Sequence, residues 1–317
     1  MPYARRELRD FARTLAAIDG DADAEALARL DAGGFLLGPG ESVNNLRERA
    51  LRLFDRLDCL DAGLARRGAA TLGPGMPEVG ANDRIDSRLL EEAGQITERL
   101  YGFRLMWAPG FYLAAVGGGG WRWRVGCAWG DADGGMAFLG LRREFRDRAR
   151  FAFCDRAEIL SHELCHLARW PFGGDERLEE FYAYRTSKRP LRRYLGNCFA
   201  SPRDAPLFVS PVLALMAATA ARAVTGGGWP IWPFWTAAMA GPLYLLGKNR
   251  AARARWFRAE RNLRRIGVAL PSAVLFRCVW EEMPFLAAAA DANALRRFAR
   301  EQPDSRWRVI ERRFLST

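Results

Sequence analysis

Histidine and lysine are scarce in this sequence. Among its 317 residues the only histidines are His162 and His166, and the only lysines are Lys188 and Lys248. The net charge of +11 at pH 7 therefore comes almost entirely from arginine. An arginine bias of this kind can follow from composition alone, so the sign of the charge does not by itself predict a nucleic-acid ligand.

Closely spaced cysteines and a secretion signal are also missing. The six cysteines lie far apart and form no CxxC pair, which excludes a disulfide scaffold and favours a reducing compartment. The first residues alternate charged and apolar side chains in place of an uninterrupted apolar region. No signal peptide is therefore expected.

Apolar spacing divides the rest of the chain into helical and extended stretches. Helical periodicity predicts helices in the first 70 residues and again over 87–100. The sequence GPGMP at 73–77 interrupts this pattern and predicts a linker. Alternation along 121–129 and the apolar run 136–141 predict two strands joined by a turn. We therefore expect an α+β fold.

The segment 205–247 differs from the rest of the chain because its only charged residue is Arg222. Two apolar runs, 205–221 and 223–247, are divided near a glycine turn at 226–228. Each is close to the ~20 residues that a helix needs to cross a hydrocarbon core of ~30 Å. The sequence predicts a two-helix transmembrane hairpin, although prolines in both runs leave a buried hairpin of a soluble protein as the alternative.

Basic residues flank this hairpin on both sides. They cluster at 185–203 and 248–265, whereas Arg222 is the only basic residue between the two clusters. By the positive-inside rule both ends of the hairpin, and with them both termini, are expected on the cytoplasmic side. The same residues suit anionic lipid head groups. The basic excess therefore predicts a membrane partner and no nucleic-acid partner.

Both histidines stand in the sequence HELCH at 162–166. Residues four apart on a helix share a face, so both imidazoles can point at one metal ion while Glu163 reaches a water bound to it. Asp155 with Glu158 predicts the start of this helix, and the pair at 170–171 predicts its end. The spacing therefore predicts two ligands of a metal site.

A zinc site requires a third protein ligand. No further histidine exists, so that ligand has to be of another type. The stretch 175–187 predicts a second helix and offers two adjacent carboxylates, Glu179 and Glu180. The residues alone leave the choice between these two open.

HExxH followed by a helix with a Glu-x-x-small pattern resembles the gluzincin type of zinc metallopeptidase. Glu180 stands three positions before Ala183 and matches that register, whereas Glu179 would place Tyr182 at the small position. The resemblance therefore favours Glu180 as the third ligand, with Glu179 as the fallback.

The resemblance covers about 120–187 and implies a zincin-like domain with a small sheet, the motif helix and the glutamate-bearing helix. It also implies that an edge strand of the sheet, 136–141, can pair with an extended peptide. The resemblance further implies that His162, His166 and Glu180 are the Zn²⁺ ligands. It also implies that Glu163 is the general base.

The chain also departs from the gluzincin pattern. Tyr184 stands where these enzymes often carry an aspartate that hydrogen-bonds the first histidine, and the spacing from His166 to Glu180 is short. The candidates for stabilising the transition state are the residues that lie near this helix in sequence: Tyr182, Tyr184 and Arg185.

Together these features predict a membrane-anchored zinc metallopeptidase that hydrolyses peptide or protein substrates on the cytoplasmic side. The alternative is a membrane-anchored, zincin-like binding protein without proteolytic activity. The predicted parts are a helical N-terminal region, a metallopeptidase domain, a transmembrane hairpin and a cytoplasmic C-terminal region: 1–80, 81–200, 201–250 and 251–317.

Three elements are expected in the C-terminal region. Residues 250–265 predict a basic helix, 273–279 a strand, and 281–300 a further helix. Nothing in their pattern predicts a role in the chemistry.

Overall fold

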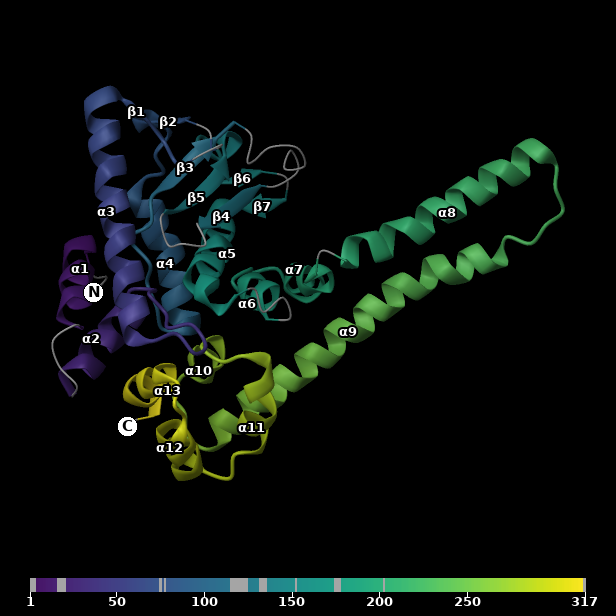
Figure 1. Ribbon diagram of the computed structural model, residues 1–317. Helices are drawn as coiled ribbons and strands as arrows, with labels where there is room; N and C mark the ends of the chain where they lie inside the picture. Colours follow the sequence, from purple (N-terminus) through teal and green to yellow (C-terminus); the bar gives the residue numbers. More distant parts are fainter. Residues whose placement is uncertain are drawn as a thin grey trace.

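In the residues that it describes, the computed structural model (Figure 1) is mostly helical, with three small sheets and one apolar helix long enough to cross a membrane. Its two ends lie on the same side of the molecule, away from a long helical projection. The structure describes residues 4–15, 21–73, 76, 78–114, 125–130, 136–151, 153–173, 178–201 and 203–315.

Three helices form the N-terminal part, as the apolar spacing predicts: α1 (Arg5–Thr14), α2 (Asp21–Ala32) and α3 (Val43–Arg67). A short hairpin of β1 (Ala69–Thr71) and β2 (Glu78–Gly80) follows α3. These strands pair across the predicted linker, of which residues 74, 75 and 77 lie outside the described part. The segment therefore joins two paired strands.

The central sheet has three described strands in the order β3-β5-β4: β3 (Gly110–Leu113), β5 (Ala137–Arg142) and β4 (Gly126–Gly130). β5 pairs parallel to β3 and antiparallel to β4. The prediction that 136–141 is the edge strand is therefore wrong, because β5 is central and β4 is the described edge beside the motif helix. Residues 121–124 of the predicted alternating strand lie outside the described part.

The motif helix α5 packs against the helix before it, the edge strand β4 and the helix after it. These helices are α4 (Ser87–Tyr101), α5 (Arg156–Arg169) and α6 (Glu179–Arg185), and α7 (Pro190–Leu195) packs against α6. Leu160 and Leu164 are fully buried and form the face of α5 opposite its histidines. Cys165 is also buried.

A two-stranded sheet of β6 (Arg150–Phe151) and β7 (Cys154–Asp155) leads into α5. Asp155 caps the helix by accepting hydrogen bonds from the backbone N–H groups of residues 157 and 158. The predicted capping partner Glu158 has a different role, because its carboxylate accepts from Ser187 Oγ and Lys188 N. Glu158 therefore ties α5 to the chain that follows α6.

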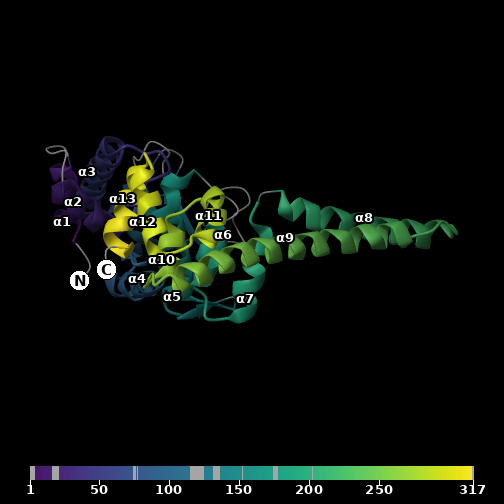
Figure 2. The ribbon, with the colours of Figure 1, turned by 90° about the horizontal axis from the view of Figure 1, so that it is seen from below.

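Two long helices, α8 (Asp204–Thr225) and α9 (Trp232–Arg265), run side by side and project from the rest of the molecule (Figures 1 and 2). They approach closely at Gly241, where a Cβ atom would lie 2.9 Å from the carbonyl oxygen of Leu207. At their base, Lys248 Nζ donates to both carboxylate oxygens of Asp204, at 2.8 and 2.9 Å. Residues 204–247 are called the arm below.

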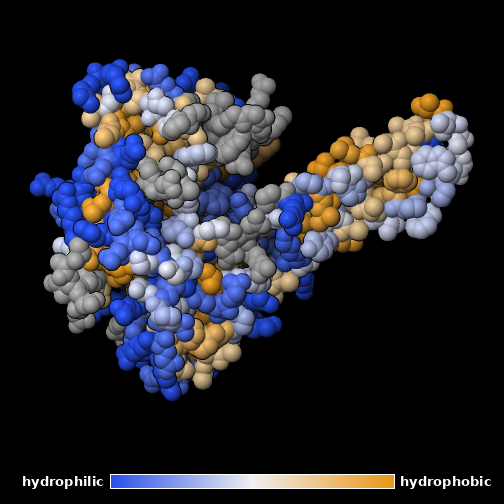
Figure 3. Space-filling model, in the orientation of Figure 1, coloured by the Kyte–Doolittle hydropathy of each residue, from blue (hydrophilic) through white to orange (hydrophobic). Residues whose placement is uncertain are grey.

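Large apolar side chains cover the arm (Figure 3), and Met216 and Trp232 are 63% and 67% exposed. Within the described residues, α8 alone is long and apolar enough to cross a membrane. α9 does not meet this criterion because Lys248 and a series of arginines follow its apolar first half. Length and composition thus fit the predicted hairpin for one of its two helices.

The C-terminal region is helical: α10 (Pro271–Phe276), α11 (Met283–Ala288), α12 (Ala292–Glu301) and α13 (Ser305–Ile310). The predicted strand 273–279 is wrong, because Pro271 starts a helix and every residue of α10 is buried. The predicted helix 281–300 is interrupted after α11, and Asp291 caps α12. The predicted basic helix 250–265 is the second half of α9.

One hydrophobic cluster connects side chains from Leu8 in α1 to Leu315 at the C-terminal end. It includes Leu139 of β5, Leu164 of α5 and Trp256 of α9. No described residue of the arm belongs to it. The four-part division of the chain stays a prediction.

Candidate metal centre

α5 places the two histidines next to each other. Their Nε2 atoms are 3.2 Å apart and their rings meet at an interplanar angle of 72°. A helix repeat of 3.6 residues brings positions 162 and 166 to one face, and Asp155 and the left-handed Gly173 mark where the helical stretch starts and ends. The two imidazoles therefore present one nitrogen each to a common point.

α6 brings Glu180 to the same point. Its Oε2 lies 3.7 Å from His162 Nε2, and its Oε1 lies 3.7 Å from His166 Nε2. The three candidate ligand atoms all lie within 4.8 Å of one another. The structure thus brings together the three residues predicted as metal ligands.

The donor set and its spacing fit zinc. Two imidazole nitrogens and a carboxylate oxygen are ligands that Zn²⁺ accepts at about 2.0–2.2 Å. In a tetrahedral site with such bonds, neighbouring ligand atoms lie about 3.3 Å apart. The two imidazole nitrogens are 3.2 Å apart, and each lies 3.7 Å from a different oxygen of Glu180. With a single carboxylate oxygen as the ligand, the three atoms lie within 4.8 Å of one another, so Glu180 has to move closer to the histidines to enclose an ion.

Glu179, the fallback ligand, faces the other side of the second histidine. Its Oε2 lies 3.6 Å from His166 Nδ1, and its Oε1 accepts a 2.7 Å hydrogen bond from Arg169 Nε. A carboxylate on the distal ring nitrogen fixes the orientation and tautomer of a metal-binding histidine. The geometry therefore separates the two glutamates into a ligand position and a supporting position.

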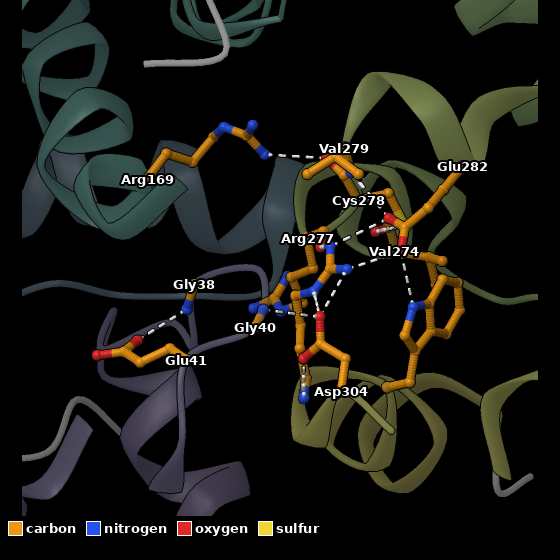
Figure 4. Close-up of polar contacts among 12 residues, drawn as sticks. Gly38, Gly40, Glu41, Arg169, Val274, Arg277, Cys278, Val279, Glu282 and Asp304 are labelled. Carbon is orange, nitrogen blue, oxygen red and sulfur yellow. Dashed lines mark hydrogen bonds and ion pairs between the residues drawn. The ribbon is translucent and has the colours of Figure 1, made fainter. Parts of the chain in front are cut away.

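Arg169 connects this supporting carboxylate to the C-terminal region. Its guanidinium is buried and donates to the carbonyl oxygens of Phe276 and Cys278 at the end of α10. Figure 4 shows Arg169 reaching toward the segment around Cys278, which is itself held by Glu282 through the backbone N–H of Val279. The orientation of His166 thus depends on residues more than 100 positions away.

α6 also contacts the first histidine. The main chain of Ala183 favours the protonated form of the His162 ring and so counters part of the lowering of its pKa. The ring of Tyr184 meets the His162 ring edge-on at a centroid distance of 4.6 Å. Tyr184, the residue at which the chain departs from the gluzincin pattern, therefore packs against a predicted ligand.

The two histidines differ in protonation when no metal is bound. Burial, together with the charges of His166 and Arg192, holds the pKa of His162 well below its ordinary value. Burial also favours the neutral form of His166, but the carboxylates of Glu179, Glu180 and Glu163 outweigh it and raise its pKa to about 9. A metal ion has to displace this one proton.

The predicted ligands line a cavity of about 520 Å³ between α5, α6, α7 and β4. Glu163 lines the same cavity and is 8% exposed. β4 comes close to it at Gly126, where a Cβ atom would lie 2.5 Å from Ile159 and 3.2 Å from Glu163 Oε1. A second cavity of about 360 Å³ continues along β4 on the far side of His166, beside Trp129 and Trp170.

Of the three candidates for transition-state stabilisation, one lines the cavity. Tyr184 does so, and burial and the nearby Glu180 raise its pKa to about 12, so its hydroxyl stays protonated. The hydroxyl of Tyr182 instead donates to the carbonyl of Leu275. Arg185 lies over the ring of Trp256, 3.9 Å from its centroid, on the other side of α6.

Sequence reasoning missed two arginines, Arg169 and Arg192. Arg169 stands three positions after His166 and so shares its helix face, a spacing that indicates proximity but not burial. Arg192 lines the main cavity from α7, and nothing in its sequence context distinguishes it from the neighbouring basic residues. Comparison with models of protein families, with curated proteins and with solved structures finds no match for this chain.

Proposed function

We propose that this protein is a membrane-anchored, zinc-dependent metallopeptidase with a zincin-like catalytic domain. The observation that supports it most is the convergence of His162, His166 and Glu180 on one point of a cavity that Glu163 also lines. The small sheet, the motif helix α5 and the glutamate-bearing α6 occur in the order expected of a zincin-like domain.

His162, His166 and Glu180 would hold the ion. Zinc bound there would lower the pKa of a water toward ~7 and polarise the substrate carbonyl. Glu163 takes a proton from the attacking water as its oxygen adds to the carbonyl carbon. It then gives that proton to the leaving nitrogen as the C–N bond breaks. Tyr184 offers a neutral hydroxyl as a donor to the reacting carbonyl oxygen.

The edge strand β4 suits an extended peptide. Among the described strands it has a neighbour, β5, on one side only, and both cavities beside His166 are lined by its residues. A peptide can therefore add to the sheet through main-chain hydrogen bonds while its side chains enter cavities on either side of the centre.

The arm would anchor this domain to a membrane. Its exposed apolar surface and the length of α8 support insertion, and the basic residues that follow on α9 suit anionic head groups. We propose that both arm helices insert and that, by the positive-inside rule, both termini and the metal centre lie on the cytoplasmic side.

The test compares wild-type protein with Glu163→Gln in detergent or nanodiscs, measuring zinc content and cleavage of a diverse peptide library by mass spectrometry. We expect about one zinc per chain in both proteins and a loss of hydrolysis of about 100-fold to 10,000-fold in the variant. Equal cleavage by both would refute the role of Glu163. Zinc-loaded wild type that binds peptides without cleaving them would instead indicate the binding protein.

A further inference from the structure

Arg192 adds a positive charge to the wall of the main cavity. It projects from α7, the helix that follows the glutamate-bearing α6, and lines the cavity together with Glu163, Glu180 and Tyr184. Its guanidinium lies 5.8 Å from the centre of the Tyr184 ring, whose edge contacts His162 at a centroid distance of 4.6 Å. This cation and a predicted metal ligand thus contact the same aromatic ring.

The side chain of Arg192 makes no hydrogen bond within the part of the chain that the structure describes. Its Nη1 is buried without a hydrogen-bond partner and lies 3.8 Å from Oε2 of Glu158, its nearest described carboxylate. That carboxylate already accepts hydrogen bonds from Ser187 Oγ and Lys188 N, so it holds the guanidinium in place without saturating it.

Neighbouring arginines are bound differently. Arg169 pairs with Glu179 and with main-chain carbonyls. Arg185 lies over Trp256 and 3.6 Å from Glu260. Arg192 keeps 21% of its side-chain surface exposed, so a carboxylate in the cavity can accept charge-assisted hydrogen bonds from the exposed part of its guanidinium.

The charge of the cavity also favours an anion. Among the described residues that line it, Glu163 and Glu180 are the two carboxylates, and a divalent ion on the predicted ligands would neutralise them. Arg192 would then give this described lining a net positive charge. Such a cavity attracts negatively charged substrates and repels positively charged ones.

We propose that Arg192 is a specificity-determining residue that binds a carboxylate of the substrate near the bond to be cleaved. This inference rests on the proposed function and names its substrate class: peptides with an acidic side chain or a free C-terminal carboxylate beside that bond. Because Arg192 and His162 contact the same Tyr184 ring, at 5.8 and 4.6 Å from its centroid, they lie within about 10 Å of each other, a distance that three peptide residues of ~3.5 Å each can span.

The test uses a pair of hydroxamates that differ only at the far end. Adipic acid monohydroxamate carries a zinc-binding hydroxamate and a carboxylate, and adipamide monohydroxamate replaces that carboxylate with a neutral amide. Calorimetry gives the affinities of both for zinc-loaded wild type, Arg192→Gln, Arg192→Lys and Arg193→Gln. Arg193 is the matched control because it is the next residue of α7, carries the same charge and is exposed.

We expect wild type and Arg193→Gln to prefer the carboxylate by about tenfold or more, and Arg192→Gln to lose this preference with unchanged zinc content. Arg192→Lys should retain part of it. An equal preference in wild type and Arg192→Gln, or none in wild type, would overturn the inference. If the protein takes up no zinc, the proposed function fails, and titration of adipate against adipamide in the metal-free proteins decides the role of Arg192.

Two tripeptides then distinguish the sources of the carboxylate by displacing the acidic hydroxamate. Acetyl-Ala-Ala-Glu-amide carries only a side-chain carboxylate, and acetyl-Ala-Ala-Gln carries only a terminal one. The tripeptide whose competition weakens about tenfold in Arg192→Gln identifies the group that is recognised. If both tripeptides compete equally well in wild type and in Arg192→Gln, the result would contradict the recognition of a peptide carboxylate by Arg192.

Discussion

The helix pair α5 and α6 and the later pair α8 and α9 expose opposite kinds of side chain. In the pair α5 and α6, leucines are buried and the polar groups of His162, His166 and Glu180 converge on a cavity. In the pair α8 and α9, the arm exposes its apolar groups and buries polar ones, such as Asp204 at its base. Apolar content alone therefore does not tell which helices form the core of this protein.

The same contrast occurs within the single helix α9. Trp235, in the arm, is 55% exposed, whereas Trp256, further along, is fully buried and packs 5.2 Å from the ring of Phe181 in α6. Phe181 adjoins the predicted ligand Glu180. One helix thus supplies both the apolar projection and the support beneath the candidate metal centre.

The largest expected effect is on zinc binding, when Glu180 or Glu179 is replaced. We expect Glu180→Ala to reduce zinc from about one per chain to near zero after gel filtration, because it removes a ligand. Glu179→Ala should retain zinc with an affinity about 10–100-fold weaker, because it removes only the partner of His166 Nδ1. Metal analysis and competition with a chelator measure both.

Equal losses in the two variants would show that the glutamates do not divide into ligand and support. Retention of zinc in Glu180→Ala together with loss in Glu179→Ala would reverse the assignment. A circular dichroism spectrum of each metal-free variant provides the control for folding.

Trp235 and Trp256 test the two halves of α9 separately. Trp256→Ala should lower the free energy of unfolding by about 3–5 kcal/mol because it leaves a cavity next to Phe181. Trp235→Ala should change it by less than about 0.5 kcal/mol in detergent and should weaken partition into lipid vesicles. Thermal unfolding and vesicle flotation measure these effects. A large loss of stability in Trp235→Ala would mean that the arm packs against protein.

The smallest expected effect is the pH dependence of zinc binding. Because the pKa of His166 is raised to about 9, zinc binding at pH 7 should release about one proton, and the apparent affinity should rise about tenfold per pH unit up to about pH 9. Without metal, the charged His166 stabilises the folded state, and this contribution is lost as the pH rises through about 9. Calorimetry in buffers of different ionisation enthalpy measures the proton count, and Glu179→Gln should reduce it.

Much of the candidate site could be predicted because its information is local. The spacing of His162 and His166 requires only a helix. The residues alone left two glutamates open, and the resemblance to the gluzincin register favoured Glu180, which the structure places beside both histidines. The order of the strands and the position of Arg192 could not be predicted, because both depend on which segments pack together. The prediction of a strand over 273–279 was wrong because a short buried apolar run can form either a strand or a helix. Pro271 was the residue in the sequence that favoured the start of a helix.

Because α9 is one continuous helix, it also sets the distance between the base of the arm and the part of the helix beneath α6. Lys248, at the base of the arm, and Trp256, beneath α6, lie two turns apart on one helix, a rise of about 12 Å. With the arm inserted as proposed, this rise would hold the metal centre at a fixed distance from the lipid head groups. Bonds at that level, in the loops and juxtamembrane tails of other membrane proteins, would come within reach, whereas those deeper in the bilayer would not.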